Sequence, residues 1–507
     1  MSREIPPRPS LEHLQKQAKD LLRLLERGQP AAIKRARAVA SFRPGARPNI
    51  ADAQHVIARE HGFAGWPKLR DHLESLAGAP DPREALVAAV TANDPAGARL
   101  VLEGHPELRA MLDQPMPGLP FGSLPLMPAV RRGDPEMIDF LLGAGADINA
   151  RSHWWAGGFG VLDLCAPAFA PFLIERGAVV DAHAAARLGM LDRLRELVGD
   201  RPDLVHARGG DGQTPLHFAA NAEIAQFLLD RGADVDARDI DHESTPAQYM
   251  VSDRQPVARF LVASGCRTDL LMAAVLGDFD LAHGHLDADP ECIRMSVTER
   301  YFPKQDPRAG GTIYIWTIGA NRTAHLVARE FGHDDVFQLL MERSPAQLRL
   351  AVACELGDRA MAESLLSGQP DLVQTLAEED RRKLADAAQD DNLEAVRLML
   401  AVGWPVAVRG LHGGTPLHWA AFHGNAEMVR EILRADPPLE LKDEDYEQTA
   451  LGWALYGSEH GWHAESGDYA GTVEALLQAG ASASEPADDL VASEPVRAVL
   501  REYGGKR

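Results

Sequence analysis

Residues 413–433 read GGTPLHWAAFHGNAEMVREIL, and this stretch decides the fold. Thr415 suits the N-cap of a helix, and Pro416 suits the first helical position because its φ is already helical and no N–H is needed there. Gly424 interrupts the pattern, and a second apolar face with helical spacing follows at Met428, Val429, Ile432 and Leu433. The stretch therefore predicts a helical hairpin, whose apolar faces are buried only when similar hairpins stack on it.

Length and composition favour a stacked, soluble architecture. At 507 residues the chain exceeds the size at which one compact core keeps growing, so several domains or a growing stack of repeats are expected. Its 45% hydrophobic and 25% charged residues are ordinary for a folded protein, and no apolar run reaches membrane-spanning length. The first ten residues, MSREIPPRPS, lack the apolar core of a signal peptide. We therefore expect a cytoplasmic protein without a membrane partner.

The net charge indicates which classes of partner to expect, and the cysteine spacing indicates the state of the thiols. The net charge is -22, but the first 77 residues carry 14 Lys and Arg against 8 Asp and Glu, so the rest of the chain holds about -28. An acidic body repels phosphate backbones, which argues against nucleic acid and favours a basic protein or a cationic small molecule. The four cysteines, Cys165, Cys266, Cys292 and Cys354, form no CxxC pair, which predicts buried free thiols.

The hairpin pattern recurs through the chain. Residues 213–237 repeat it with QTPLHFAA and DRGADVDA, and residues 124–150 carry PLMPAVRRGDPEMIDFLLGAGADINA. The TPLH opening, the central glycine, the closing GAD tail and the spacing of about 33 residues resemble the ankyrin-repeat family. The resemblance implies an all-α solenoid, here of about twelve irregular repeats, that acts as a non-enzymatic scaffold for protein partners. In this family the TPLH histidine is structural, which applies to His217 and His418.

The N-terminal residues lack the repeat pattern. Residues 10–76 read as about four helices, the third over 49–61, with Phe63 and Trp66 expected to pack at a corner between helices. The run ADAQHVIAREHGFAGWPKLRDHLESL resembles a helical module that precedes the repeats in bacterial ankyrin-repeat proteins. The expected role of this module is to cap the first repeat. The alternative is that its basic cluster at 34–37 contacts an acidic partner.

Three insertions interrupt the repeats, and a repeat array places such insertions on one face, often the binding face. The first combines residues 114–123 and 153–160, the second is 295–320, and the third is 457–468. The second contains GTIYIWTIG, whose alternation predicts a short strand or an extended finger. The expected domains are an N-terminal module (1–78), a first repeat block (79–294), the insertion (295–320), a second block (321–484) and a C-terminal cap helix and tail (485–507).

The family resemblance also indicates which positions face the groove. They are the turn-tip residues before Thr-Pro and the two residues after Ala-Ala in each repeat. Aromatic and histidine side chains at such exposed positions suit recognition. The predicted partner-binding residues are Leu411, His412, Phe422, His423, Tyr446, Gln448, Tyr456, Arg329 and Glu330.

A small-molecule receptor or enzyme is the alternative, because aromatic and titratable residues concentrate in the last third of the chain. The possible pocket residues are His460, Trp462, His463, Tyr469 and Trp316. His460 and His463, with Glu465 and Asp468, lack the spacing of a helical metal motif, so no metal or cofactor is predicted. No nucleophile elbow, phosphate loop or dinucleotide fingerprint is present, and no catalytic residue is predicted. The oligomeric state is left open.

Overall fold

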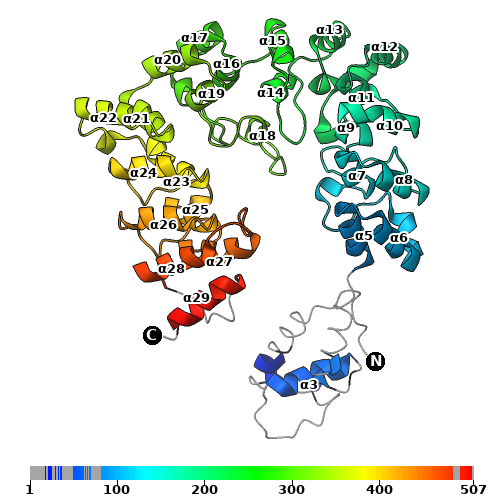
Figure 1. Cartoon of the computed structure of the whole chain (residues 1–507), viewed down its shortest axis with the longest axis horizontal. Helices are drawn as coiled ribbons and strands as arrows, with labels where there is room; N and C mark the ends of the chain where they lie inside the picture. Colours follow the sequence, from blue (N-terminus) through cyan, green and yellow to red (C-terminus); the bar gives the residue numbers. More distant parts are fainter. Residues whose placement is uncertain are drawn as a thin grey trace. The chain divides into compact units, whose positions relative to one another are not determined.

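The computed structural model describes residues 81–482 and 491–504 and, within the first 80 residues, 50–61 and scattered positions between 18 and 69. The described residues are helices joined by turns and loops (Figure 1), and the strand-type pairing among them is one isolated bridge between Ser296 and Thr323. The predicted all-α architecture is thus confirmed. The chain divides into two compact units, Met1–Trp154 with Gly158–Val179, and Trp155–Gly157 with Val180–Arg507.

The first unit contains the N-terminal module and the first hairpins. Its helices are α3 (Ile50–Glu60), α5 (Pro82–Thr91), α6 (Pro95–Gly104), α7 (Leu126–Arg132), α8 (Pro135–Gly143), α9 (Val161–Leu164) and α10 (Ala170–Glu175). Helix α3 matches the helix expected over 49–61, and Phe63 and Trp66 pack against the small core formed by Leu21, Val56 and Ile57. The other three predicted helices of the module lie largely outside the described residues.

The second unit is a succession of helical hairpins (Figure 1). Two hydrophobic cores run through it, one over residues 182–352 and one over residues 350–500. Both cores draw on helix α21, so burial continues from hairpin to hairpin as expected for stacked repeats. Its helices are α11 (Ala182–Arg187), α12 (Leu191–Asp200), α13 (Ala222–Asp230), α14 (Pro246–Met250), α15 (Gln255–Ala263), α16 (Leu270–Leu276), α17 (Phe279–Ala288), α18 (Tyr314–Thr317), α19 (Ala324–Glu330), α20 (Asp334–Arg343), α21 (Ala346–Glu355), α22 (Arg359–Gly368), α23 (Glu378–Gln389), α24 (Leu393–Ala401), α25 (Pro416–Phe422), α26 (Ala426–Leu433), α27 (Ala450–His460), α28 (Tyr469–Ala479) and α29 (Glu494–Gly504).

The TPLH stretch forms the hairpin that its sequence predicts. Thr415 caps α25 while the His418 ring accepts the Thr415 backbone N–H through Nδ1 at 3.1 Å. Since Nδ1 is an acceptor, Nε2 carries the proton and donates to the carbonyl of Gln448, 3.1 Å away in the next repeat. Gly424 then adopts φ +65°, and a Cβ there would lie 2.9 Å from the Tyr469 ring. His418 is therefore structural, as the family resemblance implied.

The insertion over 295–320 is mostly loop and turn, with one helical turn in the segment where a short strand or an extended finger was expected. Its GTIYIWTIG segment forms the one-turn helix α18. The alternation arises because Tyr314 is fully buried, with its hydroxyl 3.0 Å from Asp269 Oδ2, whereas Trp316 is 72% exposed. The strand prediction is wrong because alternating burial over so few residues does not distinguish a strand from a single helical turn.

The four cysteines are free and buried, as predicted. No helix in the part of the chain that the structure describes has both the length and the apolar character needed to cross a bilayer.

Candidate functional site

The candidate site is built on two consecutive turn tips of the second unit, at 411–414 and 444–447. His412 lies in the left-handed region with φ 59°, and its carbonyl accepts the backbone N–H of Glu444 at 3.0 Å. The Arg409 guanidinium bonds the carbonyls of Gly413 at 2.6 Å and Lys442 at 3.0 Å. These bonds fix one tip against the next, and the His412 ring nitrogen Nδ1 lies 2.7 Å from Asp445 Oδ2.

An aromatic pocket opens beside these tips. Its volume is about 650 Å³, and its walls come from the turn tips, α25, α27, the insertion that follows α27, and the segment before α29. We define the aromatic pocket by its lining residues, which are His412, Trp419, Phe422, Tyr446, Gln448, Gly452, Trp453, Leu455, Tyr456, Trp462 and Val491.

Edge-to-face and stacked rings make the walls of the aromatic pocket. The Trp419 and Trp453 ring centroids are 4.9 Å apart at an interplanar angle of 86°, and the Trp453 indole N–H donates to Asp443 Oδ2 at 2.9 Å. Trp462, from the insertion, contacts Phe422 edge to face at 5.3 Å. Such ring pairs hold one another in place, so the pocket is formed before anything binds.

Three of the lining rings remain open to solvent. Trp462 is 66% exposed, and Tyr446 and Tyr456 are each 57% exposed, whereas Trp419 and Trp453 are buried except for their pocket edges. Large aromatic side chains are normally covered, and their exposure together in one hollow is typical of a recognition site.

The surroundings of the aromatic pocket are strongly acidic. From Glu440 to Asp468 the chain has eight carboxylates and one basic side chain, Lys442. Of these carboxylates, Glu444, Asp445, Glu447, Glu459, Glu465 and Asp468 are exposed. These carboxylates are sequence neighbours of the lining residues and do not line the pocket themselves, so the negative field around the pocket favours a cation.

Six of the predicted site residues line the aromatic pocket: His412, Phe422, Tyr446, Gln448, Tyr456 and Trp462. Leu411 lies on the same turn tip and is 41% exposed. His460 packs beside the Tyr456 ring at 4.9 Å. The turn tips and the insertion thus come together, although they are separated by about 50 residues in sequence.

His423 and Tyr469 support the pocket from behind. The His423 ring is buried, its Nε2 lies 2.9 Å from the Gln389 carbonyl, and burial lowers its pKa. The Tyr469 hydroxyl donates to the Phe422 carbonyl at 2.8 Å, and burial raises its pKa to about 12. His463 stands 5.2 Å from the His423 ring. In the described residues, His460, His463, Glu465 and Asp468 do not form a group of ligand atoms close enough for one metal ion.

Arg329, Glu330 and Trp316 lie elsewhere. Arg329 pairs with Asp334 at 2.6 Å and stacks over Phe337, while Glu330 lies 3.8 Å from Arg322. Trp316 is on α18 within the 295–320 insertion and does not line the aromatic pocket. Arg329 and Glu330 were predicted from their repeat positions, and Trp316 from its place in the 295–320 insertion. Neither signal shows how far a residue lies from the aromatic pocket.

Sequence reasoning missed Trp419 and Trp453 as pocket residues. Both occupy framework positions after TPLH or its equivalent, and both are buried. The available signal was their size, because the same position holds the smaller Phe218, Tyr249 and Val327 in other copies. A Trp there extends beyond the core and reaches the pocket.

A second cavity of about 580 Å³ lies between the 295–320 insertion and α23. Six of its charged side chains form the pairs Arg294–Asp380, Arg300–Glu379 and Arg382–Asp386, and Lys383 pairs with Glu355. Such mutual compensation is typical of an internal ion network that ties the insertion to the repeats, and the aromatic pocket is the better candidate for ligand binding.

Comparison with known proteins agrees with the architecture. A family model described as "Ankyrin repeats (3 copies)" matches residues 182–272 and 384–486, and one described as "Ankyrin repeat" matches residues 121–153. Among curated proteins, E3 ubiquitin-protein ligase KEG of Arabidopsis thaliana is 22% identical over 290 residues, which is 48% of this chain and 18% of that protein. The chain thus spans less than a fifth of the length of that relative.

Proposed function

The chain is an ankyrin-repeat protein, and we propose that it is a non-enzymatic scaffold whose aromatic pocket takes a basic side chain of a protein partner. Ankyrin repeats generally mediate protein–protein interactions. The observation that carries the proposal is the joint exposure of Tyr446, Tyr456 and Trp462 around one hollow with an acidic rim.

The chemistry of the walls suits a cation. A Lys or Arg head group within about 6 Å of an aromatic face is attracted by the ring quadrupole, and the attraction is stronger when water is excluded. The Trp462 and Tyr446 rings provide exposed faces, and Asp445 provides a carboxylate on the rim. A basic partner also gains from long-range attraction, since eight of the nine charged side chains between Glu440 and Asp468 are acidic.

The remaining groove positions extend the proposed contact. The repeat pattern places partner contacts at successive turn tips, so a bound segment would run from the tip at 444–447 toward the tip at 411–414 and beyond. Leu411 at 41% exposure offers an apolar contact along that path. The protein is proposed to act in the cytoplasm.

A capture experiment tests the proposal. We expect Trp462→Ala with Tyr456→Ala to lose a partner that the wild-type chain captures from lysate of its source organism, with little change in melting temperature because both rings are exposed. Phe422 is less suitable for this test, because its ring packs against Trp453 at 5.9 Å. Trp316→Ala is the matched control, since Trp316 is equally exposed but lies outside the pocket. Capture that survives the double substitution would contradict the proposal.

A small-molecule receptor is the second candidate, favoured by the pocket volume of about 650 Å³, which falls in the range of ligand sites. The insertion that carries Trp462 would then act as the wall that encloses the ligand. A thermal-shift screen with a panel of cationic metabolites separates the two candidates. A compound that raises the melting temperature of the wild type but not of Trp462→Ala supports the receptor, whereas a protein partner without any such compound supports the scaffold.

A further inference from the structure

The turn tips of the aromatic pocket have a counterpart earlier in the second unit. Residues 208–217 read RGGDGQTPLH and residues 409–418 read RGLHGGTPLH, so Asp211 occupies the position of His412. Arg208 bonds the carbonyls of Gly212 and Arg238 as Arg409 bonds its two carbonyls. On the following tips, Asp241 and His242 take the positions of Asp445 and Tyr446. The same backbone therefore presents a different set of side chains.

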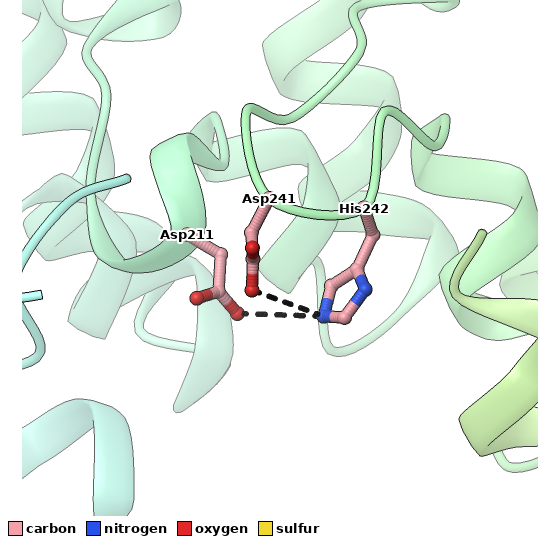
Figure 2. A group of neighbouring side chains, drawn as sticks. All are labelled: Asp211, Asp241 and His242. Atoms are coloured by element: carbon pink, nitrogen blue, oxygen red, sulfur yellow. Dashed lines mark ion pairs between the residues drawn. The ribbon is translucent and has the colours of Figure 1, made fainter. Parts of the chain in front are cut away.

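Asp211, Asp241 and His242 converge on one point (Figure 2). The His242 ring nitrogen Nε2 lies 3.7 Å from Asp241 Oδ2 and 4.0 Å from Asp211 Oδ2. One ligand atom from each residue lies within 4.8 Å of the other two. The two distances from His242 Nε2 exceed that of a hydrogen bond, so the ring does not bond either carboxylate directly.

The 295–320 insertion fixes the orientation of His242. The His242 Nδ1 lies 2.9 Å from the carbonyl oxygen of Gly311, which only accepts hydrogen bonds. Nδ1 therefore donates the bond, which leaves the lone pair of a neutral ring on Nε2, facing the two carboxylates. A histidine that binds a metal is commonly held in this way, with its second nitrogen donating to a backbone carbonyl.

Asp241 provides a second, independent indication. This residue is only 5% exposed, and its Oδ1 accepts the Gly310 N–H at 3.2 Å. Its Oδ2 is directed toward the His242 ring, 3.7 Å from Nε2. A buried carboxylate is costly without a counter-charge, and a cation between Asp241 and Asp211 would provide one.

We propose that Asp211, Asp241 and His242 bind a divalent transition-metal ion, with Zn²⁺ the best fit. Zn²⁺ accepts imidazole nitrogen and carboxylate oxygen at about 2.0–2.2 Å, which places tetrahedral ligand atoms roughly 3.3 Å apart. The two separations from His242 Nε2 reach that value with shifts of less than about 1 Å. Ca²⁺ and Mg²⁺ are less suitable because they prefer oxygen ligands alone. The fourth position is left for water.

The ion would join three segments that are distant in sequence. Asp211 comes from one turn tip, Asp241 and His242 come from the next, and Gly310 and Gly311 belong to the insertion that orients them. No metal was predicted from the sequence, and this site has no sequence motif because Asp211 and Asp241 are 30 residues apart. The site shares no residue with the aromatic pocket, so either proposal can be contradicted by experiment without affecting the other.

Zinc titration of the chelator-treated full chain tests the site. We expect one equivalent of tightly bound Zn²⁺ in the wild type, a rise in melting temperature on binding, and a loss of affinity of more than about 100-fold in His242→Ala. Asp211→Asn is the second variant, because Asp211 is only partly buried and its amide replacement tests the site if His242→Ala does not fold. Co²⁺ in place of Zn²⁺ should give a visible absorption band that both variants lose.

His283→Ala is the matched control, since His283 pairs with Asp287 at 3.1 Å on the exposed face of α17 and has no part in the cluster. It should bind Zn²⁺ as the wild type does. Equal Zn²⁺ affinity in the wild type, His242→Ala and Asp211→Asn would overturn the proposal, and so would wild-type binding weaker than millimolar.

Discussion

The indole ring of Trp462 stacks on that of Trp419, with ring centroids 6.1 Å apart and an interplanar angle of 26°. Trp419 belongs to the repeat framework, whereas Trp462 comes from the insertion that follows α27. The insertion thus converts a buried framework ring into the floor of a pocket. Trp462 remains 66% exposed, so its other face is available to a ligand.

Trp462→Ala should weaken binding of a basic partner at least tenfold, because aromatic anchors at the centre of an interface are worth about 2 kcal/mol or more. The melting temperature should change little, since the ring is mostly exposed. Isothermal titration with the captured partner measures the affinity. Trp316→Ala removes an equally exposed indole outside the pocket and should bind as the wild type does.

Binding should weaken as salt concentration rises, because the attraction between a basic partner and the acidic rim is screened over about 10 Å at 0.1 M salt. Glu459→Gln with Glu465→Gln removes two exposed carboxylates near the pocket and should reduce both the affinity and its salt dependence. Glu223→Gln, on the exposed face of α13, removes a carboxylate far along the chain and should leave both unchanged. A salt-independent affinity in the wild type would show that the rim does not attract the partner.

Tyr469→Phe should destabilise the chain by about 1 kcal/mol, because it removes the hydrogen bond from the Tyr469 hydroxyl to the Phe422 carbonyl at 2.8 Å. Chemical unfolding followed by circular dichroism measures this change. Tyr446→Phe removes an exposed hydroxyl at the pocket and should leave stability within error. Equal stability of the two variants would mean that the bond behind the pocket contributes nothing.

His217 should make the chain less stable in acid. Burial lowers the pKa of His217 from 6.5 to about 3. Below about pH 6.5 the His217 side chain therefore binds a proton in the unfolded chain but not in the folded chain. The free energy of unfolding that neutral His217 contributes is fully present above pH 6.5. It is lost as the pH falls toward 3, at up to about 1.4 kcal/mol per pH unit. Asp390 has the opposite effect on stability in acid. Burial raises its pKa to about 6, so the folded chain binds a proton there before the unfolded chain does as the pH falls.

His217→Gln isolates the histidine contribution. Its free energy of unfolding should fall less steeply than that of the wild type between pH 6.5 and pH 4, while the effect of Asp390 is common to both chains. Urea titrations at several pH values measure the two slopes. Identical slopes would mean that His217 is protonated in the folded state.

The repeat framework was predictable from sequence because each feature has a local cause. Thr415, Pro416 and Gly424 specify where the helices begin and end, and the spacing from Met428 to Leu433 specifies the buried face. His418 was assigned a structural role, and its bonds to Thr415 and Gln448 confirm it. The total of about twelve repeats remains a prediction.

The site was predictable only in part, because the path of an insertion depends on packing between distant residues. The turn-tip pattern indicated His412 and Tyr446, and unusual composition indicated Trp462, but nothing local showed that they meet at Trp419 and Trp453. The cluster of Asp211, Asp241 and His242 was missed for the same reason. Its third segment lies in the 295–320 insertion, whose GTIYIWTIG stretch was predicted to be a short strand or an extended finger.

Fluorine NMR of the chain labelled with 5-fluorotryptophan tests the central claim most directly, since the protein has eight tryptophans that substitution can assign one by one. The titrant is a lysine-rich peptide, compared with a peptide of equal length in which norleucine replaces lysine. The account predicts that the lysine peptide shifts the signals of Trp419, Trp453 and Trp462 but not that of Trp316, and that the norleucine peptide shifts none. Equal shifts with both peptides, or shifts at Trp316 alone, would contradict it.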